Sequence, residues 1–170
     1  EEDHKLMYLM SEIADIENSA EESYLLTIAD IHSGATFKTE YNEYSPEIMI
    51  ERFEYLTERI INFIKNHKCK VLYVVGLGDF IQGCIHMNDL KINDSTVVKA
   101  TVQVSQIMTQ FLNNISKYTH VYYYHIISSN HSQMRYLGTK PSELMGEDME
   151  YIIGHYIKDS LTNNKNVDVY

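Results

Sequence analysis

Residues 71–79 read VLYVVGLGD, and this stretch decides the fold class. The near-continuous apolar run Val71–Leu77 is typical of a parallel strand that is covered on both of its faces. Gly78 permits a tight exit from the strand, and Asp79 places a carboxylate at its carboxyl end. Three further β-type runs lie elsewhere in the chain, at Tyr24–Ala29, Val121–Ile127 and Asn166–Tyr170. We therefore predict four strands, of which the one quoted first is the most buried.

Helical patterns separate these four runs. Ser45-Pro46-Glu47 combines a capping hydroxyl, a proline at the first helical position and an early acid, which predicts the start of a helix that continues to about residue 67. A second helix is predicted to begin near a capping Asp94, and a third to run from about Glu143 to Leu161. Thr36–Tyr44 is predicted to be a polar loop. This βαβαβαβ order predicts an α/β fold with a mostly parallel sheet and right-handed crossovers.

The composition is that of one globular domain. The 170 residues are 44% hydrophobic and 22% charged, which is sufficient for a buried core. Residues 1–22 hold eight acids and one base, whereas residues 23–170 hold 16 acids and 13 bases. We predict an acidic helix or linker over 1–22 and one domain over 23–170. The sequence has no basic stripe of the kind that binds duplex DNA.

Other features bear on where the protein acts. No apolar run approaches the ~18 residues of a membrane span, and the acidic N-terminus lacks the basic and apolar regions of a signal peptide. Cys69 and Cys84 do not form a CxxC pair, which favours reduced thiols. We expect a cytoplasmic protein without a membrane partner, and its oligomeric state stays open. Because the chain begins at Glu1 rather than Met, we expect it to be part of something longer.

Three short polar motifs carry the chemistry, and each follows a predicted strand. They are Asp30-Ile31-His32, Gly78-Asp79 and Asn130-His131. Each motif alone has an ordinary explanation, such as a turn or capping residue beside an exposed histidine. The carboxyl ends of parallel strands lie side by side, however, so the three motifs are expected to converge. Carboxylate, imidazole and amide ligands in such a cluster predict a dinuclear metal site.

In this order the three motifs resemble those of the calcineurin-like metallophosphoesterases, and the chain looks closest to phage and bacterial proteins labelled DNA-repair-exonuclease-like. The resemblance covers about residues 23–170 and implies part of a four-layer α/β/β/α sandwich. It implies that Asp30 and His32 bind a first ion, that Asp79 bridges two ions, and that Asn130 binds the second. His131 would be the catalytic acid. Mn²⁺ is the first expectation for both ions, with Fe, Zn, Ni and Mg left open.

The chain departs from the family pattern in three places. Ser129 stands where the third motif usually has glycine, and Gly78-Asp79 is followed by Phe-Ile-Gln-Gly, where another acid or histidine is usual. The family's later histidine motifs are missing, so this chain would supply only part of each ion's ligand set. His155 superficially resembles one of those ligands, but the apolar period runs through it and predicts a helix residue.

Residues outside the motifs are weaker candidates. His86 could reach a phosphate from the loop after Asp79. Arg135 could hold a phosphate oxygen with its guanidinium, or it could be a solvated loop residue. His125 lies within a predicted strand, so we expect it to be packed in the interior.

The resemblance implies metal-dependent phosphoester hydrolysis. Two ions would lower the pKa of a bridging water, which would attack phosphorus while His131 protonates the departing oxygen. A nucleic-acid phosphodiester, DNA or RNA, is the leading substrate. The first alternative is a phosphomonoesterase or small-nucleotide phosphodiesterase on the same metals. The second is a non-catalytic module that keeps the fold with an incomplete metal site.

Overall fold

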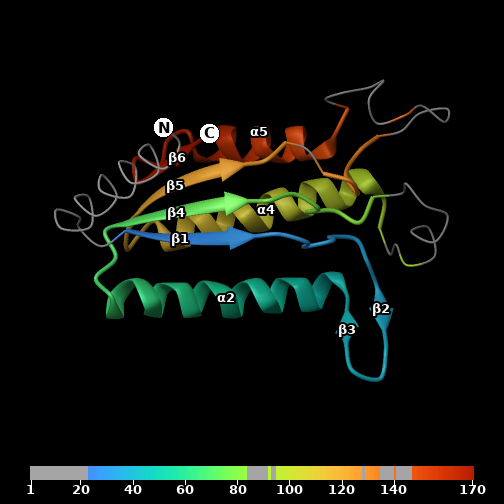
Figure 1. The fold of residues 1–170 in the computed structure, drawn as a ribbon, viewed down its shortest axis with the longest axis horizontal. Coiled ribbons are helices and arrows are strands. Elements are labelled where there is room, and N and C mark those ends of the chain that lie inside the picture. Colours follow the sequence, from blue (N-terminus) through green and yellow to red (C-terminus); the bar gives the residue numbers. More distant parts are fainter. Residues whose placement is uncertain (1–22, 84–91, 93–94, 128, 135–139, 141–146) are drawn as a thin grey trace, which may run out of the picture.

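The computed structural model describes residues 23–83, 92, 95–127, 129–134, 140 and 147–170, and it has an α/β fold (Figure 1). The main sheet has the strand order β1-β4-β5-β6, and its neighbouring strands all run parallel. The predicted alternation of strands and helices is therefore confirmed. The elements in chain order are β1 (Ser23–Ile28), α2 (Pro46–Asn66), β4 (Val71–Gly76), α4 (Val97–Ile115), β5 (His120–His125), α5 (Met149–Leu161) and β6 (Val167–Val169).

A small hairpin occupies the segment that the sequence predicts to be a loop. Strands β2 (Phe37–Lys38) and β3 (Glu43–Tyr44) pair antiparallel beyond the end of the main sheet (Figure 1). The turn is closed by a hydrogen bond from the Thr39 backbone N–H to the Asn42 carbonyl, 2.8 Å long. Two-residue strands are too short to produce a recognisable period, so the polar sequence alone could not reveal them.

The helix starts follow capping chemistry. Ser45 caps α2 as predicted, since its hydroxyl accepts a hydrogen bond from the Ile48 N–H at 3.3 Å. Thr96 rather than Asp94 caps α4, and Asp94 itself lies outside the described residues. Helix α5 is capped by Asp148, so the predicted start near Glu143 is wrong. Glu147, directly before that cap, accepts a hydrogen bond from the Met134 N–H, and Asp148 itself bridges to Gln133, while Glu143 lies outside the described residues.

Helices of the described chain cover one face of the main sheet. Leu72 and Val74 of β4 are buried, whereas Tyr73 between them is 39% exposed. The prediction that β4 is covered on both faces is therefore wrong for the described residues. The reason is the strand order: each new strand is added on the same side of the previous one, and right-handed crossovers then place every connecting helix on the same face.

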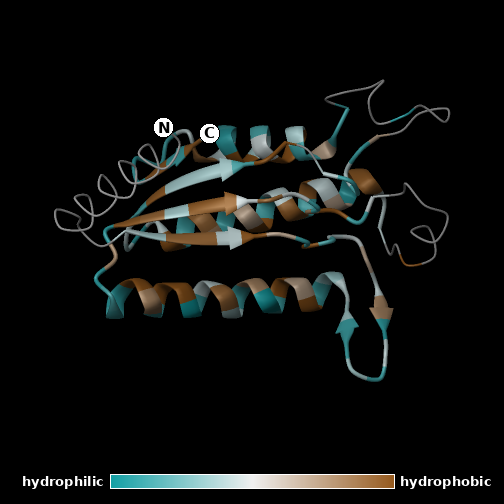
Figure 2. Ribbon diagram, in the orientation of Figure 1, coloured by the Kyte–Doolittle hydropathy of each residue, from teal (hydrophilic) through white to brown (hydrophobic). Residues whose placement is uncertain are grey.

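The core lies between this face and the helices. Figure 2 shows α2 alternating between hydrophilic and hydrophobic residues along its length, as expected for a helix with one solvent face. The helical side chains that are nearly or completely buried include Met49, Ile64, Val104, Met108, Phe111, Leu112, Ile115, Ile153 and Ile157.

The opposite face of the sheet carries large, mostly aromatic side chains that the described chain leaves exposed or half-buried. We call it the open face and define it by Leu25, Tyr73, Tyr122, Tyr124 and Tyr170. Tyr73 pairs in register with Leu25 on one side and Tyr122 on the other. The rings of Tyr73 and Tyr122 stack with centroids 5.3 Å apart, and those of Tyr124 and Tyr170 stack at 4.8 Å.

Within the described chain no helix combines the length and apolar character that crossing a membrane requires.

A matched pair of substitutions tests which face of the sheet is the core face. Leu72→Ala, at a side chain that is 2% exposed, should lower the free energy of unfolding by about 2–5 kcal/mol. Leu25→Ala, at a side chain that is 66% exposed, should change it by less than about 0.5 kcal/mol. Urea unfolding followed by circular dichroism measures both. An equal loss for the two variants would mean that the open face is covered in solution.

Candidate metal centre

The loops that follow β1 and β4 run side by side and are joined by backbone hydrogen bonds. The N–H of His32 donates to the carbonyl of Asp79 at 3.0 Å, and that of Ser33 donates to Phe80 at 2.8 Å. The Gln82 N–H returns a bond to the Ser33 carbonyl at 3.0 Å. The first two predicted motifs are thus held together by main-chain contacts that do not depend on their side chains.

The third motif joins them through the Asp79 carboxylate. The backbone N–H of His131 donates to Asp79 Oδ1 at 3.0 Å. One terminal atom of the Asn130 side-chain amide lies 3.1 Å from Asp79 Oδ1 and 2.7 Å from Oδ2. With nitrogen at that position, the amide donates to the carboxylate.

The backbone at three of the predicted ligands is in the left-handed region. Asp30, His32 and Asp79 have φ values of 53°, 50° and 55°. Residues with a Cβ rarely adopt this conformation, although Asp tolerates it better than most. Such conformations cost about 1–3 kcal/mol each and gather at functional sites. Their coincidence with the predicted motifs supports a functional role for this edge of the sheet.

His32 has the properties of a neutral nitrogen ligand. Its Nδ1 is buried and has no hydrogen-bond partner among the described residues. Burial lowers the pKa of His32, and the neighbouring His131 lowers it further, while Asp79 and Asp30 oppose both effects. The neutral imidazole that metals bind is therefore favoured at neutral pH. Its Nε2 lies 3.7 Å from Oδ1 of Asp30, which is 72% exposed.

His131 is positioned with one ring nitrogen occupied. Its Nδ1 lies 3.0 Å from the backbone carbonyl of Gln82 and 3.4 Å from the side-chain Nε2 of the same residue; the shorter contact favours a proton on Nδ1, because a carbonyl can only accept. The ring meets that of His32 edge to face, with centroids 4.7 Å apart. Gly83, at φ 66°, allows the backbone of His131 to approach closely, because a Cβ at residue 83 would lie 1.9 Å from the His131 carbonyl oxygen.

The predicted ligands therefore meet, but as two pairs and not as one compact cluster. Among the described residues, no three His, Cys, Asp or Glu side chains are gathered closely enough to hold a metal ion. Asp30 and His32 form one pair, and Asp79 and Asn130 form the other. Oδ1 of Asp30 and Nε2 of His32, 3.7 Å apart, are spaced so that they fit a cation between them. Each pair would need further ligands to complete a coordination shell.

Two carboxylates that support these loops were not predicted from the sequence. Asp148 accepts hydrogen bonds from the N–H groups of Ser129 and Glu150, both at 2.9 Å. Burial raises the pKa of Asp148, and these two hydrogen bonds oppose the rise. Glu150 is completely buried. In the sequence both acids read as polar positions of a helix, and no pattern distinguishes them from solvent-facing acids.

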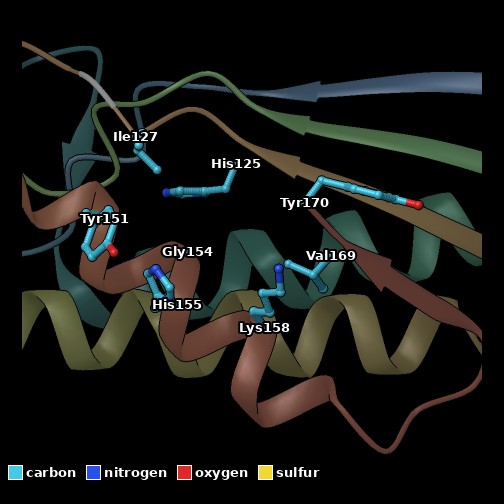
Figure 3. Close-up of a pocket in the computed structure, with 8 residues that line it drawn as sticks. All are labelled: His125, Ile127, Tyr151, Gly154, His155, Lys158, Val169 and Tyr170. Carbon is cyan, nitrogen blue, oxygen red and sulfur yellow. The ribbon is translucent and has the colours of Figure 1, made fainter. Parts of the chain in front are cut away.

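Several other predicted residues lie apart from this site or cannot be placed. His86, Arg135 and residues 1–22 lie outside the described residues. His125 is buried in β5, as predicted, and His155 lies within α5, as predicted. Both histidines line a separate cavity of about 150 Å³ between α5 and the ends of β5 and β6 (Figure 3). Lys158 and the last residue of the chain, Tyr170, complete part of its wall.

Comparisons with known proteins give one informative match. The chain is 28% identical over 153 residues to the SPbeta prophage-derived uncharacterized protein YonJ of Bacillus subtilis (strain 168). The match covers 89% of this chain but only 38% of the length of that relative. No protein-family model matches the chain, and no solved structure matches it.

The left-handed backbone at Asp30 predicts an inverted order of glycine and alanine stabilities. Asp30→Gly should be about 1 kcal/mol more stable than Asp30→Ala, because only glycine adopts this φ without steric cost. At Asp159, an exposed position in α5, alanine should instead be more stable than glycine by about 1 kcal/mol. Urea unfolding of the four variants measures both differences. If alanine were more stable than glycine at both positions, Asp30 would not be left-handed in solution.

Proposed function

We propose that this chain carries part of a two-metal phosphoester hydrolase site and that its substrate is a phosphodiester, with nucleic acid as the first candidate. The observation that carries the proposal is the meeting of three strand-end motifs around one carboxylate. Asp79 contacts both Asn130 and His131, and its loop is joined by backbone bonds to the loop of His32. Oxygen and imidazole ligands in this arrangement suit divalent ions such as Mn²⁺.

The proposed roles follow from the surroundings of each side chain. Asp30 and His32 would hold one ion, Asn130 would hold a second, and Asp79 would lie between them. Divalent ions, when bound, would neutralise phosphate charge and lower the pKa of a coordinated water. With Nδ1 of His131 donating to the Gln82 carbonyl, a ring protonated on both nitrogens would give its Nε2 proton to a departing oxygen.

One feature favours a small substrate as the second candidate. A cavity of about 200 Å³ adjoins Asp30 and is lined mainly by apolar side chains. They include Ile28, Ile31, Tyr44, Met49, Phe53 and Leu56. An apolar recess of this size beside a metal ligand would accept a single planar group, such as one nucleobase. It supports a small-nucleotide phosphodiesterase or a phosphomonoesterase as the alternative to a nuclease.

We also propose that the described sheet is one half of a four-layer α/β/β/α sandwich. The open face supports this proposal, because four of its five large side chains are exposed and the fifth, Tyr122, is half-buried, and such an apolar patch is normally covered. A second sheet packed on it would add the two missing layers. The chain spans 38% of the prophage relative, which leaves ample length in that protein for such a sheet. In a longer protein with this architecture, Leu25→Ala would cost as much stability as Leu72→Ala.

Metal binding tests the proposed site directly. Mn²⁺ titrated into the protein in a calorimeter should bind, and Asp79→Asn should weaken that binding at least about tenfold, because even changes behind the ligands cost 10–100-fold. Asp159→Asn, on the exposed side of α5, is the matched control and should bind as the wild type does. Equal affinity in both variants would show that Asp79 is not a ligand.

Hydrolysis tests the role of His131. His131→Ala should keep Mn²⁺ binding but lose about 10²–10⁴-fold in kcat on a dinucleotide, whose alkoxide leaving group needs a proton. The loss should be smaller on bis(p-nitrophenyl) phosphate, whose leaving group departs as a stable anion. His120→Ala is the control. That imidazole lies at the start of β5, away from the site, and its Nε2 is 2.7 Å from Oδ2 of Asp168.

The same assays separate the alternatives. Faster turnover of p-nitrophenyl phosphate than of the diester would favour the phosphomonoesterase. Mn²⁺ binding without hydrolysis of any of these substrates would favour the non-catalytic module.

A further inference from the structure

A buried carboxylate lies directly behind the candidate metal centre and contacts two of its loops at once. Oε1 of Glu150 accepts a hydrogen bond from the Phe80 N–H at 2.8 Å and another from the Ser132 hydroxyl at 2.7 Å. Phe80 immediately follows Asp79, and Ser132 immediately follows His131. Phe80, Ser132 and Glu150 are each 0% exposed. One oxygen atom thus ties together the two chain segments that carry Asp79 and His131.

The second oxygen of Glu150 is anchored in the core. Oε2 lies 2.9 Å from Nε2 of His125, and Nδ1 of that ring lies 2.6 Å from the Tyr123 hydroxyl. Burial raises the pKa of Tyr123 well above its usual value, so the phenol keeps its proton and donates it to Nδ1. His125 then donates Nε2–H to Glu150. The carboxylate therefore receives three donors and has no exposure to solvent.

Packing holds the histidine in place. Figure 3 shows His125 at the end of β5, directly above Gly154 of α5. A Cβ at Gly154 would lie 3.0 Å from Cδ2 of His125. A Cβ at Gly76 would lie 2.8 Å from the Tyr123 hydroxyl and 3.1 Å from His125 Nδ1. The two glycines leave just enough room for the ring, so the far end of the hydrogen-bond chain has little freedom to move.

We propose that Glu150 is a positioning residue, which sets the separation of Asp79 and His131 by holding the backbone N–H of Phe80 and the hydroxyl of Ser132 on one oxygen. The inference rests on the proposed function in so far as Asp79 is a metal ligand and His131 a proton donor. The hydrogen bond from the His131 N–H to Asp79 Oδ1 joins the same two loops from the solvent side. Glu150 joins them from the core side, and the two links together fix both loops.

The test uses a matched pair of serine substitutions. Ser132→Ala removes one donor to Glu150 and leaves the carboxylate, His125 and the backbone contacts in place. Ser105→Ala is the control: this serine is equally buried, at 1% exposed, and its hydroxyl bonds to the Thr101 carbonyl within α4. Two readouts are needed. One is amide hydrogen exchange without metal, resolved by nuclear magnetic resonance, and the other is Mn²⁺ affinity.

The expected result is a local change. Ser132→Ala should accelerate exchange of the Phe80 and His131 amides about tenfold while the amides of β4 and β5 keep their rates, because only the loops loosen. It should also weaken Mn²⁺ binding about tenfold, as changes behind metal ligands do. Ser105→Ala should leave both readouts as in the wild type.

Two outcomes would overturn the proposal. If Ser132→Ala matched Ser105→Ala in amide exchange, Glu150 would not set the loop separation. If exchange rose uniformly across β4 and β5, the role of Glu150 would be in general stability. A wild-type protein that bound no Mn²⁺ would instead count against the proposed function, and the exchange measurement made without metal would still decide whether Glu150 positions the loops.

Discussion

The carboxylate of Asp79 is the contact on which the candidate site depends. It receives the His131 N–H and faces the Asn130 amide, so it joins the loops after β4 and β5. Its own loop is bonded through the backbone to the loop after β1. A charged acceptor forms stronger hydrogen bonds than a neutral one, particularly where water is partly excluded. Three segments that are distant in sequence are therefore held at one edge of the sheet by a single side chain and its neighbouring amides.

The local conformations are costly, and the rest of the domain supports them. Left-handed backbone at Asp30, His32 and Asp79, together with a buried nitrogen of His32 that has no partner in the described chain, would not persist in an isolated loop. The parallel sheet and the buried core provide the stability that offsets this cost. The buried Glu150 carboxylate adds a second support, because its three donors come from β5, from the loop after β4 and from the loop after β5. Within the described residues few side chains are placed to hold a metal ion, but several hydrogen bonds hold the loops of the candidate site together.

The two faces of the sheet have different physical characters. One face is packed against helices and supplies the core. The open face carries stacked tyrosines. Each stacked pair covers part of its ring surface, but a substantial apolar area still faces solvent. The strand order explains this asymmetry, since successive crossovers of one hand in one direction place all the helices together.

Much of the fold could be predicted from the sequence because it depends on local patterns. The four main strands, the Ser45 cap of α2 and the parallel topology follow from apolar period, capping chemistry and the alternation of elements. The order of the polar motifs at the strand ends also predicted which residues meet, since parallel strands bring their carboxyl ends to one edge. The hairpin β2–β3 and the start of α5 were not predicted, because two-residue strands have no period and Asp148 resembles any other acid in a helical pattern.

Other properties were decided only by the tertiary structure. The sequence does not distinguish Glu150 from a solvent-facing acid, because its burial and its three donors come from residues up to 70 positions away. It does not indicate that β4 is covered on one face, because a run of valines and leucines suits either case. Nor does it reveal the lowered pKa of His32 or the contact between His131 Nδ1 and the Gln82 carbonyl, since both depend on neighbours brought together by folding. Period and capping are properties of adjacent residues, whereas burial, protonation and hydrogen-bond partners depend on the packed environment.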